Sequence, residues 1–135
     1  MNNVRFSTSL HIMSLLAYQQ GELLSSDYIA SSININPVIV RKEISNLKKY
    51  GLIESKEGKG GGNILGKPAK KIFLSDIYHA VSNQNALGKT NNPNVKCPVG
   101  KQINKHLNSL YSEVEATLIK KLNKISLSDF IHQFK

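Results

Sequence analysis

Cysteine and tryptophan are almost absent from this sequence of 135 residues, which holds one cysteine, Cys97, and no tryptophan. A single thiol excludes an internal disulfide bond and indicates a reducing compartment. No N-terminal apolar run resembles a signal peptide, and no stretch approaches the ~20 apolar residues that a membrane-spanning helix needs. We therefore expect a cytoplasmic protein that has no membrane partner.

Acidic residues are also scarce, because nine Asp and Glu face eighteen Lys and Arg, for a formal net charge of +9. This excess of positive charge favours a polyanionic partner, and nucleic acid first, over a basic surface that serves solubility alone. The chain length fits one ordinary domain, or a small domain with an extension.

No set of residues indicates an enzyme or a metal site. The four histidines lie on separate segments without the spacing of zinc ligands, and no pair of carboxylates stands out. Ser45 and Lys48 match the S-x-x-K pattern of penicillin-recognising enzymes, but the companion motifs are missing and we take the match as chance. We expect neither catalytic residues nor a bound metal ion.

The stretch GKGGGNILGKP, residues 58–68, raises a nucleotide-binding alternative. From Gly61 to Lys67 it falls one residue short of the phosphate-binding pattern G-x-x-x-x-G-K-[ST], and Pro68 offers no hydroxyl for Mg²⁺. A phosphate loop also needs a helix directly after its lysine, whereas KKIFL at residues 70–74 is typical of extended chain. We interpret the glycines as the tip of an antiparallel hairpin.

Two helices are expected before residue 34. The first covers residues 6–19, where apolar side chains recur at helical spacing, and its N-cap is expected to be Ser7 or Thr8. The second is short and is expected to begin at a cap of Ser25 or Ser26.

The third helix carries the strongest local signals. Asn36 is a good N-cap, Pro37 suits the first helical position, and Gly51 suits the C′ position that ends the helix. Asn34 can adopt the left-handed conformation that a tight turn before this helix needs. At 100° per residue, the expected core stripe is Val40, Ile44 and Leu47. The opposite, polar and cationic stripe is Val38, Lys42, Ser45 and Lys49, flanked by Arg41 and Asn46.

After Gly51 the pattern changes from helical to strand-like. Residues 52–56 and 63–66 are expected to form two short strands around the glycine-rich tip. Glycine permits a close approach to a phosphate or a groove wall, while Lys56 and Lys59 supply positive charge. Two helices joined by a tight turn and followed by a hairpin indicate a winged helix-turn-helix.

The C-terminal third is expected to be helical as well. A helix over residues 74–82, with Ser75 as its cap, leads into a polar loop at 83–97. From Pro98 a helix of about 25 residues begins, roughly 37 Å long at 1.5 Å per residue. Its apolar stripe is Val99, Ile103, Leu107, Leu110, Val114, Leu118 and Leu122. The tail is expected to form a last short helix.

A continuous stripe of this length is too long to be buried against residues 1–82 alone. We therefore expect a homodimer whose interface is this stripe, as in coiled-coil pairing, and the alternative is a helix that wraps along its own domain. The predicted fold is mainly α with a small β-hairpin wing. Residues 1–82 are expected to form the winged helix-turn-helix domain, 83–97 a sensor loop, and 98–135 a long dimerisation helix with a short C-terminal helix.

Three segments carry a resemblance to a known family over nearly the full chain. They are INPVIVRKEISNLKKYGLIESKEGKGGG, KPAKKIFLSDIYHAV and NPNVKCPVG. At these separations they resemble the Rrf-two family of bacterial winged-helix transcription regulators, which includes IscR, NsrR and CymR. The resemblance implies homodimers on imperfect palindromes, base contacts from Asn36, Val38 and Arg41, and a wing that enters the minor groove. The expected DNA-binding set is Asn36, Pro37, Val38, Arg41, Lys42, Ser45, Lys49, Lys56 and Lys59.

The sequence departs from that family in two places. Glu57 stands where an arginine commonly enters the minor groove, so that role is not carried over and Lys59 is the nearest substitute. Cluster-binding members carry three cysteines in the loop before the long helix, whereas this chain has Cys97 alone. We therefore expect no iron–sulfur cluster and no other cofactor, and the chain is more similar to the cluster-free, YwnA-like branch.

Cys97 directly precedes Pro98 and is expected at the N-cap of the long helix. There the helix dipole, together with Lys96 and Lys101, would lower the pKa of the thiol. The alternative is an ordinary small residue at a helix start. Oxidation of a lone cysteine would end at sulfenic acid, at a mixed disulfide with a small thiol, or at a bond to another chain.

The functional hypothesis is a sequence-specific DNA-binding repressor that acts as a homodimer on a palindromic operator and is released by oxidants or electrophiles through Cys97. One alternative is a DNA-binding regulator controlled by a small ligand or a partner protein. Another is a helix-mediated interaction protein that does not touch DNA. An RNA-binding module is disfavoured, because the aromatic residues are scattered and form no stacking surface.

Overall fold

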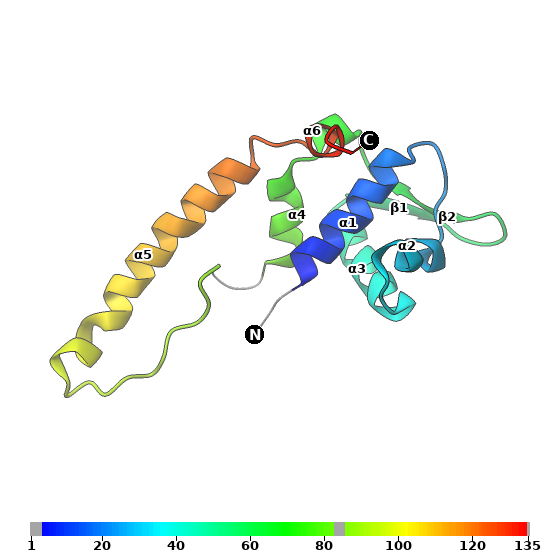
Figure 1. Ribbon diagram of the computed structural model, residues 1–135. Helices are drawn as coiled ribbons and strands as arrows, with labels where there is room; N and C mark the ends of the chain where they lie inside the picture. Colours follow the sequence, from blue (N-terminus) through cyan, green and yellow to red (C-terminus); the bar gives the residue numbers. More distant parts are fainter. Residues whose placement is uncertain (1–3, 83–85, 135) are drawn as a thin grey trace.

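Figure 1 shows the protein as a computed structural model, which describes residues 4–82 and 86–134. The elements in chain order are α1 (Arg5–Tyr18), α2 (Ser26–Ile33), α3 (Pro37–Lys49), β1 (Ile53–Lys56), β2 (Gly62–Leu65), a 3-10 turn (Ala69–Lys71), α4 (Leu74–Val81), α5 (Pro98–Leu122) and α6 (Leu127–Ile131). The first four helices, the hairpin and α6 gather at one end, while α5 leans away on the other side (Figure 1). The predicted fold class, mainly α with a hairpin wing and a long C-terminal helix, is confirmed.

The helix-turn-helix forms where the local signals placed it. The Ser25 hydroxyl caps α2, and Asn34 ends it in the left-handed region at φ 66°. Asn36 then caps α3, because its side-chain oxygen accepts the N–H of Val38 at 2.9 Å. Gly51 follows α3 at φ 74°, a conformation that glycine adopts without strain. These four predictions are confirmed.

The expected cap of α1 is wrong. The helix begins at Arg5, and the N–H of Thr8 already donates to the carbonyl of Val4 at 2.9 Å. Thr8 is buried, and the Ser7 hydroxyl donates back to the Val4 carbonyl at 3.0 Å. Helical bonding therefore starts one turn earlier than the polar side chains suggested.

The expected cap of α4 is also wrong. Phe73 is the N-cap residue, and its N–H donates to the Asp76 carboxylate at 2.8 Å. Ser75 is buried inside the helix, where its hydroxyl donates to the side-chain oxygen of Asn123 at 2.8 Å. The extended chain expected over residues 70–74 is likewise only partly right, because Ala69–Lys71 forms a 3-10 turn before the backbone extends.

One hydrophobic core joins the N-terminal module to the end of the chain. Its most buried large side chains are Ile12, Met13, Ile29, Val40, Leu47, Leu52, Ile72, Ile77 and Leu127. Leu127 comes from α6, which packs against α1, and a backbone bridge joins Phe73 to Ser126. In space, α6 therefore lies with the winged module. The functional division into 1–82, 83–97 and 98–135 stays a prediction, and residues 83–85 lie outside the described part of the chain.

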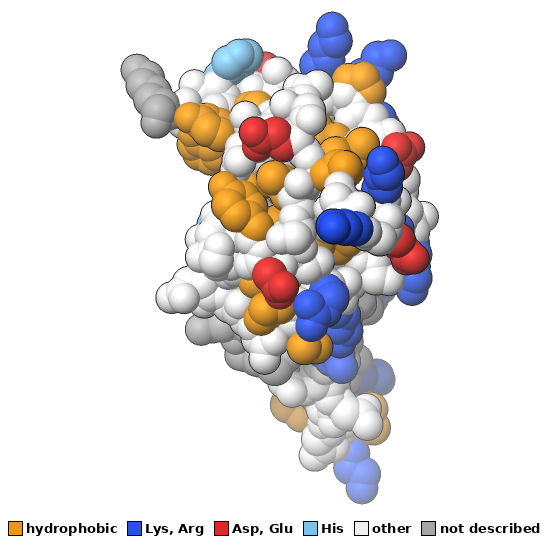
Figure 2. Space-filling view, turned by 90° about the vertical axis from the view of Figure 1, so that its right-hand side faces the viewer, with side chains coloured by type: hydrophobic (Ala, Val, Ile, Leu, Met, Phe, Trp, Pro, Cys, Tyr) orange, Lys and Arg blue, Asp and Glu red, His pale blue; other side chains and the backbone are white. Residues whose placement is uncertain are grey.

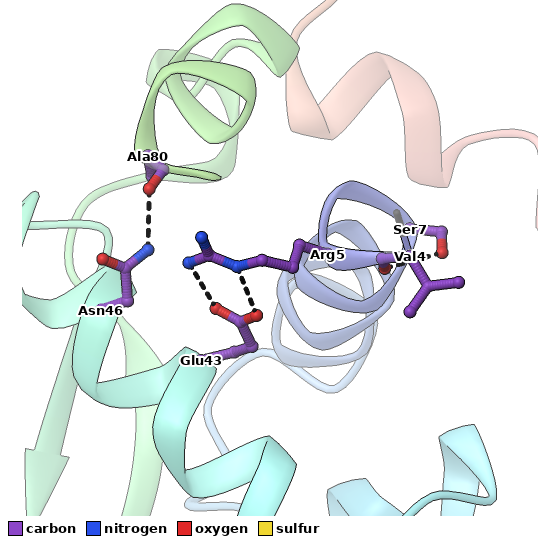
Figure 3. A network of polar contacts seen from close by, with 6 residues as sticks. All are labelled: Val4, Arg5, Ser7, Glu43, Asn46 and Ala80. Atoms are coloured by element: carbon purple, nitrogen blue, oxygen red, sulfur yellow. Dashed lines mark hydrogen bonds and ion pairs between the residues drawn. The ribbon is translucent and has the colours of Figure 1, made fainter. Parts of the chain in front are cut away.

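A polar network fastens α3 to two other helices (Figure 3). Arg5 of α1 donates two hydrogen bonds to the Glu43 carboxylate, at 2.8 and 3.0 Å. Asn46 of α3 donates to the carbonyl of Ala80, near the end of α4, at 2.8 Å. Asn46 thus faces α4, which corrects the expectation that it flanks the outward face of α3.

We expect Arg5→Ala to lower the free energy of unfolding by about 2 kcal/mol. The change leaves the Glu43 carboxylate, whose side chain is 7% exposed, without its bidentate partner. Loss of one member of a buried pair costs several kcal/mol, and the lower figure allows for an Arg5 side chain that is 37% exposed. Urea unfolding of the parent and the variant measures this change in the free energy of unfolding. Arg5→Met with Glu43→Leu should recover most of the loss, whereas an Arg5→Ala protein within about 0.5 kcal/mol of the parent would contradict the role of the pair.

Candidate nucleic-acid interface

The outward face of α3 is open to solvent along its length. Asn36, Val38, Arg41, Lys42, Ser45 and Lys49 are exposed, and Pro37 is half-buried. Arg41 lies 3.8 Å from Asp27, and both side chains are more than half exposed. An ion pair of that kind contributes little, so the guanidinium can turn to another anion at small cost.

The wing is a two-stranded antiparallel hairpin beside α3. Ile53 pairs with Leu65 and Lys56 pairs with Gly62, which leaves residues 57–61 as the tip. Lys56 and Lys59 are both exposed. In Figure 2, which looks at the wing end of the molecule, the Lys and Arg side chains lie on the right half of the face. The structure thus places the predicted lysines on open surface.

Asn63 anchors the wing to the rest of the module, and its role was not predicted. The residue is 6% exposed, and its side chain donates to the Leu24 carbonyl at 2.9 Å and accepts from the Ser55 hydroxyl at 2.6 Å. Backbone bonds between Leu24 and Asn63 add a bridge to the hairpin edge. A Cβ on Gly62 would lie 2.8 Å from the Leu23 backbone, so this glycine is needed for the close approach.

Tyr78 and Ser75 connect α4 to the C-terminal half of α5. The Tyr78 hydroxyl donates to the Glu115 carboxylate, and Ser75 binds Asn123 just beyond the helix. Burial, and then the hydrogen bond to Glu115, raise the pKa of Tyr78, so the phenol is neutral at physiological pH. One face of α4 therefore contacts α5, while its C-terminal end contacts α3 through Asn46.

The N-terminal half of α5 contacts the turn that precedes it and leaves most of its apolar side chains exposed. No residue of α5 is buried, and the apolar side chains of Val99, Ile103 and Leu110 are 66%, 39% and 48% exposed. The remaining stripe residues, Leu107, Val114, Leu118 and Leu122, are half-buried. The helix stands away from the module over its first turns (Figure 1). Wrapping along its own domain therefore accounts only for the C-terminal part of the stripe.

Cys97 occupies the N-cap of α5, as the sequence predicted, and its thiol is exposed. The pKa of this thiol is lowered, because the backbone N–H groups of Gly100 and, secondarily, Val99 favour the thiolate. The direction agrees with the sequence prediction. The cause is the pair of amides in the first turn of α5, which agrees with the effect expected from the start of the helix.

The turn before α5 is held against the first turns of the helix. The Asn94 carbonyl accepts the N–H of Cys97 at 3.2 Å, and the Asn94 side chain accepts the N–H of Lys96 at 2.9 Å. A Cβ on Gly100 would lie 2.4 Å from the Asn94 carbonyl oxygen, which explains the glycine in C-P-V-G. Asn104 also donates to the Asn91 carbonyl at 2.8 Å. The turn that precedes Cys97 is therefore ordered by hydrogen bonds and close contacts with the first turns of α5.

The residues that the structure describes form neither a metal site nor a membrane-spanning helix. No three His, Cys, Asp or Glu side chains among them gather where they could hold a metal ion. None of the described helices combines the length and the hydropathy needed to cross a bilayer.

Comparison with known proteins gives one consistent result. Residues 2–133 match the family model described as Rrf2, iron-dependent transcriptional regulator. YwnA of Bacillus subtilis (strain 168), named as a candidate HTH-type transcriptional regulator, is 39% identical over 133 residues, which cover 98% of each chain. A crystal structure described as a candidate DNA-binding protein has a TM-score of 0.74 at 35% identity, and covers 94% of this chain and 98% of its own. CymR, the global cysteine regulator of B. subtilis, has a TM-score of 0.75 at 20% identity over 100% of this chain and 98% of its own.

Proposed function

Because the chain belongs to the Rrf2 family of transcriptional regulators, which are not enzymes, we propose that it is a homodimeric repressor that binds a palindromic operator. The observation that carries the proposal is the outward face of α3, which is exposed and cationic and lies beside a wing that bears Lys56 and Lys59. Each subunit places α3 in a major groove, where side chains meet base edges, while the wing lysines contact phosphates at the adjacent minor groove. The partner is double-stranded DNA.

The homodimer is part of the same proposal. Val99, Ile103 and Leu110 are exposed apolar residues on one stripe of a helix that leans away from its own module. Paired α5 helices would cover this stripe and set the distance between two α3 helices. Half-site centres should then lie about one helical turn apart, ~10–10.5 bp, or a multiple of it.

The family description names iron, and the residues of this chain do not fit an iron–sulfur cluster. Such clusters are held by cysteine thiolates, commonly four, and Cys97 is the one cysteine in the sequence. Two subunits together would offer two thiolates. No step of the proposed mechanism therefore passes through a cluster.

The regulatory part of the proposal is a thiol switch. A peroxide would oxidise the Cys97 thiolate to sulfenic acid and would itself be reduced to water or an alcohol, and an electrophile would alkylate the same sulfur. Either product adds bulk beside the turn that Asn94 and Gly100 hold on α5. The loop before this turn leads back to α4, whose Ala80 carbonyl binds Asn46 of α3. A displaced turn can thus reorient the two DNA-reading helices.

Treatment with hydrogen peroxide should weaken operator binding by the parent protein and leave the Cys97→Ser protein bound. The lowered pKa of the thiol increases the thiolate fraction at neutral pH, so alkylation should reach half its maximal rate below the pH expected for a free cysteine. DNA-binding titrations with and without peroxide, together with the pH dependence of alkylation, measure both effects. Equal release of DNA by the Cys97→Ser protein would end the thiol-switch proposal.

A groove under the wing favours one second candidate, which is control by a small ligand. Its volume is about 640 Å³, and it lies between the end of α1 and the hairpin. The lining residues include Leu16, Leu23, Ile64, Lys56 and Lys67. A ligand bound there would act on the wing directly, and release of DNA would then be independent of Cys97.

Selection of bound sequences from random duplexes tests the central proposal. A palindromic consensus, confirmed by mobility shift, is the expected result. Failure to enrich any sequence, with no shift of genomic fragments, would favour the non-DNA alternative in which α5 mediates protein contacts only.

A further inference from the structure

Two large apolar side chains project into solvent from the first turn of α3. Val38 is 60% exposed and Ile39 is 49% exposed, whereas Val40, one position further, is completely buried. The core stripe of the same helix therefore leaves both side chains outside. Neither belongs to the hydrophobic core.

The surroundings of this pair indicate what kind of surface would cover it. At 100° per residue, Val38 shares the outward stripe with Lys42, Ser45 and Lys49. Arg41 is exposed on the flank of that stripe. An apolar protein surface would leave these cations without counter-charges, whereas a polyanion with apolar groups would match both features.

The hydrogen bond at the N-cap of α3 further limits which base groups this turn can recognise. The side-chain oxygen of Asn36 accepts the N–H of Val38 at 2.9 Å, so this oxygen is already engaged in the helix. Bidentate recognition of adenine by asparagine uses that oxygen together with the amide NH₂. The first turn of α3 therefore offers mainly the apolar surfaces of Val38 and Ile39 to the base edges.

In the major groove, the apolar group on a base edge is the C5-methyl of thymine. We propose that Val38, with Ile39 beside it, contacts thymine methyl groups, and that each operator half-site carries thymine at the positions these side chains face. This inference rests on the proposed function and adds the identity of a base and the group that is read.

Deoxyuridine gives a direct test, because it removes the methyl group and keeps the base pairing. In the selected operator, each thymine is replaced in turn and the binding constant of the full-length protein is measured. At one or two positions per half-site, uracil should weaken binding by about fourfold, or ~0.8 kcal/mol, for each methyl lost from a packed contact. Symmetric replacement in both half-sites should weaken binding by about 16-fold, which is the single-site factor squared.

The variants assign the methyl contact to its residue. Val38→Ala should bind the thymine and uracil operators equally at the position that Val38 faces, and Ile39→Ala should do so at the neighbouring one. Val38→Thr keeps one of the two methyl groups and should keep part of the discrimination. Val4→Ala makes the same truncation outside α3, at a side chain that is 63% exposed. This control should keep the full discrimination between the thymine and uracil operators.

Two results would overturn the inference. One is specific operator binding that tolerates uracil at every thymine, and the other is undiminished discrimination in both alanine variants. Either result leaves the proposed function standing, because specific binding is retained. A parent protein that selects no DNA sequence at all would instead refute the proposed function on which the inference depends.

Discussion

Replacing Ile103 and Leu110 together by lysine should convert the protein to monomers and weaken operator binding by at least about 100-fold. Both side chains are exposed on the apolar stripe of α5, at 39% and 48%. A dimer would bury them, and each substitution would place an unpaired cation in the seam. Breaking apolar contact and burying uncompensated charge costs several kcal/mol, and each 1.4 kcal/mol is a factor of ten.

The choice of these two residues separates dimerisation from folding. Leu118 and Leu122 belong to the same stripe but are half-buried, and Leu122 packs against the core of its own subunit. Ser109→Lys with Ser112→Lys adds the same charge to exposed positions on the other side of α5 and serves as the matched control. Light scattering and DNA titration measure the outcome. A dimer that persists in the Ile103→Lys, Leu110→Lys protein would remove this stripe as the interface.

Arg41→Ala should reduce the preference for operator over random DNA by about 10- to 100-fold for each half-site. A guanidinium that binds a guanine edge through two hydrogen bonds contributes ~1–3 kcal/mol to discrimination. Arg41 lies on the exposed flank of α3, and its weak contact with Asp27 at 3.8 Å does not hold it. Binding to non-operator DNA should fall far less, because that affinity comes from phosphate contacts.

Lys49→Ala is the contrasting substitution on the same helix. Lys49 lies in the last turn of α3, and the loss of its phosphate contact should weaken all duplexes alike. The slope of log affinity against log salt should fall by about 0.9 for each lost contact. Lys105→Ala, on the exposed side of α5, is the control. If Arg41→Ala and Lys49→Ala both left specific and non-specific affinity unchanged, α3 would not be the reading helix.

The sequence alone determined the local architecture of the DNA-reading unit. The caps of α2 and α3, the left-handed turn at Asn34 and the end of α3 at Gly51 all depend on residues within a few positions of one another. Such signals act through short hydrogen bonds and intrinsic backbone preferences, so they can be read from sequence without knowledge of the fold. The apolar stripe of α5 and the N-cap position of Cys97 were predicted for the same reason.

Only the tertiary structure decided which polar residues serve the fold. Glu43 lies 38 positions from Arg5, and Asn46 lies 34 positions from Ala80. Ser75 meets Asn123, and Asn63 meets Leu24, over separations of 48 and 39 positions. On a helical or strand pattern these side chains look like ordinary surface or capping groups, because a pattern records which face a residue occupies and not what lies opposite.

The same limit explains the errors at the starts of α1 and α4. Thr8 and Ser75 have the side chains of N-caps, and both are buried in helices whose first turns begin earlier. A serine or threonine hydroxyl can find a hydrogen-bond partner at a helix cap, within a helix, or on a distant segment. The free energies of these placements differ locally by only about 1–2 kcal/mol. Burial of apolar neighbours against α6 and the core can outweigh that difference, and at α4 the bond from the Phe73 N–H to the Asp76 carboxylate favours the earlier start as well.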